Sequence, residues 1–137
     1  MIMRIIGIDF GDSRTGYAVS DPLGFGVTSL PPCKEKGMRK VLEHTAGLLK
    51  EYDTKKIVLG FPKNMNGTIG PRGEKTKAFK EMLETELGAE VVLWDERLTT
   101  VSAHALMNET NVRGQKRKNS VDSISAAFIL QSYLDSI

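Results

Sequence analysis

A short apolar run near the start of the chain places the strongest constraint on the fold. Residues 5–10 are almost uniformly apolar and lead into a turn at Gly11. A run of this length is typical of a central strand covered on both faces. Residues 15–20 and 25–30 follow as two further strand-like segments, separated by short turns. Together the three segments predict an antiparallel meander.

The pattern changes after residue 30, because residues 31–37 contain two prolines and a glycine that interrupt the strand signal. The expected elements are a helix over 38–52, a strand over 56–60, a helix from Pro71 to Gly88, a strand over 90–94, a short helix from Thr99 or Thr100 to about Asn108, and a last helix capped by Ser120. Hairpin strands followed by helix-separated strands predict an α/β fold. We expect a mixed five-stranded sheet with helices on both faces, in a single domain spanning residues 1–137.

Positive charge is concentrated in two segments, although the whole chain carries a formal net charge of only +2. Residues 61–80 and 110–120 each carry a net charge of +4, so the rest of the chain sums to −6. Polar, basic loops are expected at 61–70 and 109–119. This separation of positive and negative charge favours a polyanionic partner that is held close to a group of carboxylates.

The sequence also indicates the cellular compartment of the protein. Cys33 is the one cysteine of the chain, so no internal disulfide can form, which fits a reducing cytosol. The apolar start is too short for a signal peptide, and no apolar run approaches the ~20 residues of a membrane span. We therefore expect a cytoplasmic protein with no membrane partner.

Acidic residues follow two of the predicted strands and lie in the last predicted helix. Asp9 ends the central strand, where a buried carboxylate is costly without a partner or a metal; a hydrogen bond to the next turn is the structural alternative. Asp95 and Glu96 end another strand, and because adjacent strand residues face opposite ways, one of the two is expected to enter a shared site. Asp122 is expected in the first turn of the last helix, where the helix dipole alone would account for it.

If these acids converge, they form a site of hard oxygen ligands. Such a site selects Mg²⁺ or Mn²⁺. Zinc is a poor candidate, because His44 and His104 are sixty residues apart and no Cys/His spacing closes a site.

Four segments, in order and spanning nearly the whole chain, resemble the motifs of a known family. They are 7–21 (GIDFGDSRTGYAVSD), 58–68 (VLGFPKNMNGT), 95–100 (DERLTT) and 121–127 (VDSISAA). The family is YqgF, a group of Holliday-junction-resolvase-like nucleases also described as pre-16S rRNA nucleases. The resemblance implies a ribonuclease-H-like fold and metal-dependent cleavage of phosphodiester bonds, with 5′-end maturation of pre-16S rRNA as the expected reaction.

The resemblance also implies roles for individual residues. The implied catalytic acids are Asp9, Glu96, Asp122 and Asp95, of which the first three are the expected ligands of two Mg²⁺ or Mn²⁺ ions. Related enzymes carry their second acid at the end of the fourth strand, but residues 59–62 contain none, so the role falls to Glu96 or Asp95, with Glu96 favoured. The expected nucleic-acid-binding residues are Arg14, Lys63, Arg72, Arg97, Arg113, Lys116, Arg117 and Lys118.

Three other functions remain open from the sequence. A Holliday-junction DNA resolvase would act as a homodimer, whereas an rRNA nuclease could act as a monomer. A non-catalytic adaptor would bind nucleic acid or ribosome-assembly particles. An actin-like or sugar-kinase-like phosphotransferase has a similar turn at residues 9–16, but such enzymes need two lobes and this chain has residues for one. Structured RNA is the expected partner, with DNA junctions as the alternative.

Overall fold

The computed structural model describes residues 4–11, 13–22, 26–62, 69–95 and 114–137, and in the last range it describes side chains from Ile124 onward. The strands are β1 (Ile6–Asp9), β2 (Thr15–Ser20), β3 (Val27–Cys33), β4 (Lys56–Phe61) and β5 (Glu90–Asp95). The helices are α1 (Met38–Glu51), α2 (Pro71–Leu87) and α4 (Gly114–Ser136). No helix within these ranges combines the length and apolar character needed to cross a bilayer.

The five strands form one mixed sheet in the order β3-β2-β1-β4-β5. Strand β2 is antiparallel to both β1 and β3, while β1, β4 and β5 are parallel to one another. The predicted mixed sheet and the central position of β1 are therefore confirmed.

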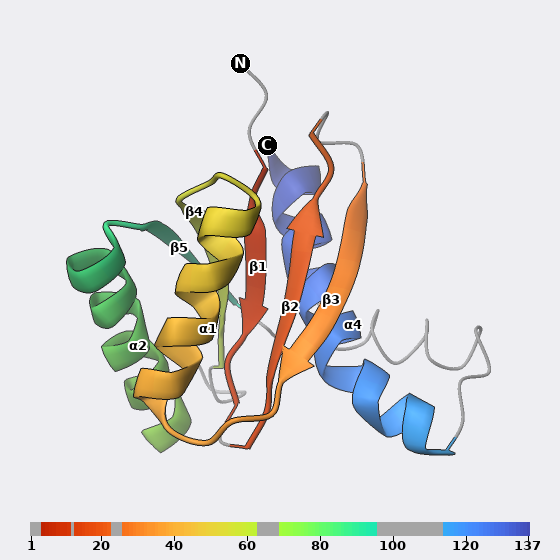
Figure 1. Ribbon diagram of the computed structural model, residues 1–137, viewed down its shortest axis with the longest axis horizontal. Coiled ribbons are helices and arrows are strands. Elements are labelled where there is room, and N and C mark those ends of the chain that lie inside the picture. Colours follow the sequence, from red (N-terminus) through yellow and green to blue (C-terminus); the bar gives the residue numbers. More distant parts are fainter. Residues whose placement is uncertain (1–3, 12, 23–25, 63–68, 96–113) are drawn as a thin grey trace.

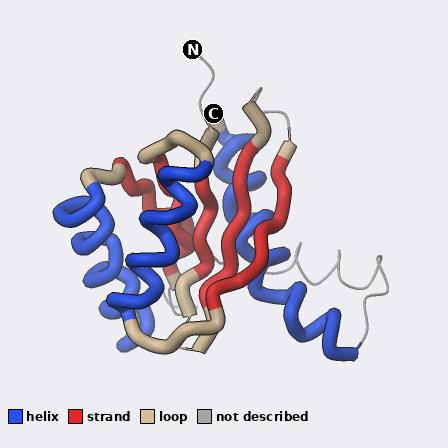
Figure 2. Tube along the Cα trace, in the orientation of Figure 1, coloured by secondary structure: helices blue, strands red, loops and turns tan. Residues whose placement is uncertain are grey.

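Helices cover the two faces of this sheet unequally. Figure 1 shows α1 and α2 in front of the sheet and α4 behind it, and Figure 2 shows the same three layers by element type. Residues 5–8 alternate between the layers: Ile6 and Ile8 of β1 belong to the core under α1 and α2, and Ile5, just before the strand, belongs to the core under α4. This burial on both faces explains why the segment is apolar almost throughout.

Gly7 is the point of closest approach between β1 and α4. A Cβ atom at this position would lie 2.8 Å from Cβ of Leu130 and 3.0 Å from the carbonyl oxygen of Ala126. The helix thus packs directly on the strand backbone, which only glycine allows here. Gly7 consequently sets how closely the last helix lies to the centre of the sheet.

Two predicted boundaries are wrong by three residues or more. Strand β3 continues through Pro31 and Pro32 to Cys33 instead of ending at residue 30, because it is an edge strand, where a proline need not donate to a neighbour. The last helix begins at Gly114 rather than at Ser120, so the predicted loop over 109–119 is helical from residue 114. Its start has no apolar stripe, but lysine, arginine and glutamine are good helix formers.

The earlier start of α4 changes the position of Asp122. This residue lies about two turns inside the helix, not in its first turn. A favourable interaction with the helix dipole, which is limited to the first turn, therefore does not account for an acid at this position. The short helix predicted over residues 99–108 lies outside the described residues.

Candidate active site at the carboxyl edge of the sheet

Strands β1, β3, β4 and β5 point in the same direction, so their carboxyl ends meet at one edge of the sheet. In Figure 1 this is the lower edge, where α1 and α2 also begin. Asp9 ends β1 and Asp95 ends β5, as the sequence predicts. Ligand sites of α/β sheets favour this edge.

Asp9 lies at the centre of the edge and on the α4 face of the sheet. It pairs with Gly16 of β2, and it follows Gly7 by two residues, the strand period that returns a side chain to the same face. Gly7 faces Ala126 and Leu130, so the side chain of Asp9 is on the side of α4. The residue is half-buried, and its Oδ1 atom is fully shielded from solvent.

Asp95 lies on the opposite face. Leu93 of β5 packs against the core under α1 and α2, whereas Trp94 packs against the core under α4 and donates a hydrogen bond from Nε1 to Ser132 Oγ at 3.1 Å. Asp95 follows Leu93 by two residues and therefore shares its face. The structure does not bring Asp95 and Asp9 together on one side of the sheet.

Most of the other predicted site residues have side chains outside the described part of the chain. Glu96, Lys63, Arg97 and Arg113 lie wholly outside it. Asp122, Lys116, Arg117 and Lys118 are placed only as positions along the backbone of α4. Asp122 precedes Ala126, which lies against Gly7, by four residues.

Two of the predicted basic residues are described, and both lie at the carboxyl edge. Arg72, in the first turn of α2, donates a hydrogen bond from Nη2 to the carbonyl oxygen of Phe10 at 3.5 Å. Its guanidinium group therefore lies one residue beyond Asp9 along the chain. Arg14 is half-buried in the connection between β1 and β2.

Sequence reasoning missed a hollow beside Arg72. A cavity of about 180 Å³ lies between the end of β1 and the start of α1, and Gly11, Gly37 and Lys75 are among its lining residues. Lys34 and Lys36, on the connection from β3 to α1, were also missed. The signal that would have found them is the true end of β3, since a strand ending at Cys33 places the next residues at the carboxyl edge.

The chemistry of the predicted ligand set is compatible with a divalent cation. Among the side chains that the structure describes, no three His, Cys, Asp or Glu residues are close enough to hold a metal. Two of the predicted ligands, Glu96 and Asp122, have side chains outside that set. The three predicted ligands would supply carboxylate oxygens alone, the donors that Mg²⁺ and Mn²⁺ prefer.

Comparisons with known proteins agree with this fold. A family model described as RuvX, Holliday junction resolvase, matches residues 3–136. A Clostridium beijerinckii protein described as "Putative pre-16S rRNA nuclease" is 50% identical over 135 residues, which is 98% of each chain. A Clostridium novyi protein with the same description is 47% identical, over 98% of this chain and 100% of its own.

Solved structures of two resolvases share the fold at low sequence identity. Thermus thermophilus RuvC in complex with a Holliday junction substrate aligns with a TM-score of 0.58 at 13% identity, over 98% of this chain and 95% of that one. The fowlpox virus Holliday junction resolvase aligns with a TM-score of 0.58 at 17% identity, over 98% and 100%. Identities this low show the ribonuclease-H-like fold alone. The family match and the relatives near 50% identity extend over almost the whole length, and the chain therefore belongs to the RuvX family, also called YqgF.

Proposed function

We propose that the chain is a divalent-metal-dependent endonuclease that hydrolyses phosphodiester bonds in structured nucleic acid, and that its reaction is 5′-end maturation of pre-16S rRNA in the cytoplasm. The observation that carries the proposal is the position of Asp9, a carboxylate on the α4 face at the carboxyl end of the central strand. The full-length relatives near 50% identity, described as pre-16S rRNA nucleases, favour RNA as the substrate.

Strand and helix periods support Asp122 as a partner of Asp9. Two strand residues advance the chain by about 6.6 Å, and four helix residues advance it by about 6 Å. Helix α4 runs antiparallel to β1 (Figure 1), and Gly7 lies against Ala126. The step from Gly7 forward to Asp9 along the strand therefore covers about the same distance, in the same direction, as the step from Ala126 back to Asp122 along the helix.

The alternation of β5 supports Glu96 rather than Asp95 as the third ligand. Trp94 is on the α4 face, which is also the face of Asp9. Asp95, the residue after Trp94, falls on the other face, which leaves Glu96 as the acid of the pair for the proposed site. The set proposed to hold the metal is thus Asp9, Glu96 and Asp122.

Each group has a defined task in the proposed reaction. Two bound Mg²⁺ or Mn²⁺ ions would lower the pKa of an attacking water and neutralise the leaving 3′ oxygen. Asp9, at the centre of the edge, would hold the ions together with Glu96 and Asp122. Arg72, held at the Phe10 carbonyl, lies where it can bind the phosphodiester backbone next to the reacting phosphate.

The test compares Asp9→Asn with Asp95→Asn, two identical changes of charge at one edge but on opposite faces. Cleavage of a structured pre-16S rRNA fragment is measured with Mg²⁺ and with Mn²⁺, and thermal unfolding verifies that both variants fold. Asp9→Asn is expected to lower the cleavage rate at least about 100-fold. Loss of a residue that only orients a metal ligand costs up to about 100-fold, so loss of a ligand itself should cost no less. Asp95→Asn is expected to stay within about threefold of the unmodified chain. Unchanged cleavage by Asp9→Asn would refute the site.

Cleavage of four-way DNA junctions is a second candidate function, favoured by the description of the family model as Holliday junction resolvase. Symmetric resolution of a junction needs two active sites, and therefore a homodimer. The same variants are tested on a four-way DNA junction, with the oligomeric state measured by sedimentation. Binding of RNA and DNA without cleavage of either would instead support the adaptor function.

A further inference from the structure

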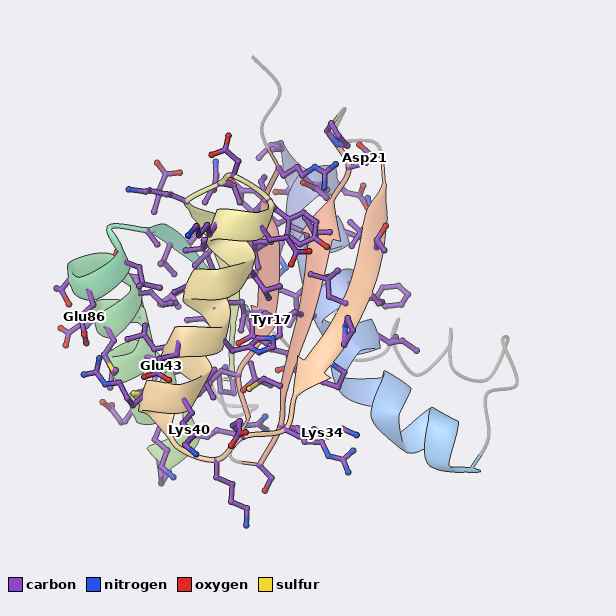
Figure 3. All side chains as sticks on the ribbon, viewed as in Figure 1. Tyr17, Asp21, Lys34, Lys40, Glu43 and Glu86 are labelled. Carbon is purple, nitrogen blue, oxygen red and sulfur yellow. The ribbon has the colours of Figure 1, made fainter. Side chains whose placement is uncertain are left out.

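The connection between β3 and α1 presents exposed charge at the same edge as Asp9. Lys34, Glu35 and Lys36 directly follow β3, and all three are exposed. Figure 3 shows the side chains of Lys34 and Lys40 at the lower edge of the molecule, where the parallel strands end. These residues lie outside both basic segments that the sequence pattern singled out.

Two carboxylates near this connection, those of Glu35 and Glu86, already have cationic partners. The carboxylate of Glu35 lies 3.6 Å from Nζ of Lys40, and Arg39 forms an ion pair with Glu86 of α2. Lys34 and Lys36 form no ion pair with any residue that the structure describes. The connection therefore offers two cations to a partner in solution.

The hollow beside β1 links these cations to the candidate active site. Gly37 lines one side of it, immediately after Lys36, and Gly11 and Lys75 line the other. A Cβ atom on Gly37 would meet no heavy atom within 4 Å, so the side of α1 is open. The hollow thus touches the connection at Gly37 and the end of β1 at Phe10 and Gly11, and Arg72 is hydrogen-bonded to the Phe10 carbonyl there.

We propose that Lys34, Lys36 and Lys75, here called the basic edge, bind the phosphodiester backbone of the substrate on the α1 side of the sheet. The proposal rests on the proposed function for the identity of the bound strand. Two strand spacings, about 10 Å, separate the ends of β3 and β1. Since one strand of a duplex advances about 3.4 Å per nucleotide, the contact lies about three nucleotides from the phosphate that is cleaved.

The experiment compares Lys34→Ala/Lys36→Ala with Lys50→Ala/Lys55→Ala. The second pair removes the same charge from exposed lysines at the opposite end of α1 and before β4. Binding of an RNA hairpin and of a four-way DNA junction is measured in EDTA between 0.05 and 0.2 M KCl, so that cleavage does not interfere. Unfolding curves verify that both variants fold.

Loss of two phosphate contacts is expected to lower the slope of log K against log salt by about 1.4–1.8. Each contact contributes a factor of about 5–8 at 0.1 M salt, so the loss of two is expected to raise Kd about 25-fold to 60-fold. The control pair is expected to keep the slope, with Kd within about twofold. An unchanged slope in Lys34→Ala/Lys36→Ala overturns the proposal, and so does an equal loss in the control pair, which would indicate net charge alone.

The outcome separates this proposal from the nuclease function. If the unmodified chain cleaves neither substrate but the slope still falls, the basic edge stands and the nuclease proposal fails. If cleavage depends on Asp9 but the slope is unchanged, the nuclease stands and the basic edge is refuted. A lower slope on both substrates identifies the shared phosphate backbone as the ligand, and a lower slope on one identifies RNA or DNA as its source.

Discussion

Replacing Gly7 by alanine would push a methyl group into α4. The new Cβ atom would lie 2.8 Å from Cβ of Leu130 and 3.0 Å from the carbonyl oxygen of Ala126. Ordinary carbon contacts lie at about 3.5–4.0 Å, so the helix would have to move by roughly 0.5–1 Å. Neither obstructing atom can leave by a change of rotamer, because both are fixed to the helix backbone. Overpacking of this kind costs about 1–3 kcal/mol.

Urea denaturation measures this cost. With a slope of about 2 kcal/mol/M for a small protein, the midpoint of Gly7→Ala is expected to fall by about 0.5–1.5 M. Gly47→Ala is the matched control, because Gly47 lies inside α1 with no heavy atom within 4 Å of the added Cβ. Alanine is favoured over glycine in a helix by about 0.5–1 kcal/mol, so the same chemical change should stabilise there.

The displacement of α4 should also affect the proposed active site. Asp122 is carried by the helix that would move, whereas Asp9 is carried by the strand. A shift of about 1 Å can cost about 100-fold in rate, so Gly7→Ala should lose cleavage at temperatures where it is fully folded. If Gly7→Ala unfolds at the same urea concentration as the unmodified chain, the packing argument is wrong. If it is destabilised but cleaves normally, α4 does not contribute to the site.

Two further predictions concern buried hydroxyl groups. The Oγ1 atom of Thr15 is buried with no hydrogen-bond partner in the described part of the chain, so Thr15→Val should raise the free energy of unfolding by about 1 kcal/mol; a lower value in urea denaturation would show that the hydroxyl is engaged. Burial raises the pKa of Tyr17, whose hydroxyl lies 2.8 Å from Oγ1 of Thr45, so the unfolded chain, with a tyrosine pKa of about 10, loses this proton first as the pH rises. The contribution of the Tyr17 hydroxyl to the free energy of unfolding is therefore constant below pH 10 and falls above it, by about 1.4 kcal/mol at pH 11. Urea denaturation between pH 8 and 11 should show this fall in the unmodified chain and not in Tyr17→Phe.

The fold could be predicted largely from the sequence because its elements are locally consistent. The central strand is apolar on both faces, and α2 begins at Pro71 and ends before Gly88, which has a φ of 65°. The missed boundaries depend on tertiary context instead. Pro31 and Pro32 are tolerated because β3 lies at the edge of the sheet, and sequence alone does not reveal which strand is the edge.

The site could be predicted only in part, because its membership depends on which face each residue occupies. The sequence offers Asp95 and Glu96 as adjacent alternatives. Strand alternation indicates only that one faces the site and the other does not, and it does not say which. The choice requires a reference point, which Trp94 supplies by packing against the α4 side of the core. Lys34 and Lys36 were missed for a related reason, since their place at the edge depends on where β3 ends.

The segment from Gly7 to Asp9 brings these arguments together, because its three residues alternate between the two faces of the sheet. Gly7 lets α4 approach the strand backbone, and Ile8 faces the core under α1 and α2. Asp9 returns to the α4 face at the point where the strand ends. A larger residue at position 7 would move the helix away from the very face on which the acid lies. The glycine and the acid therefore form one structural unit, in which a constraint on helix packing fixes the distance across which the proposed metal ligands must meet.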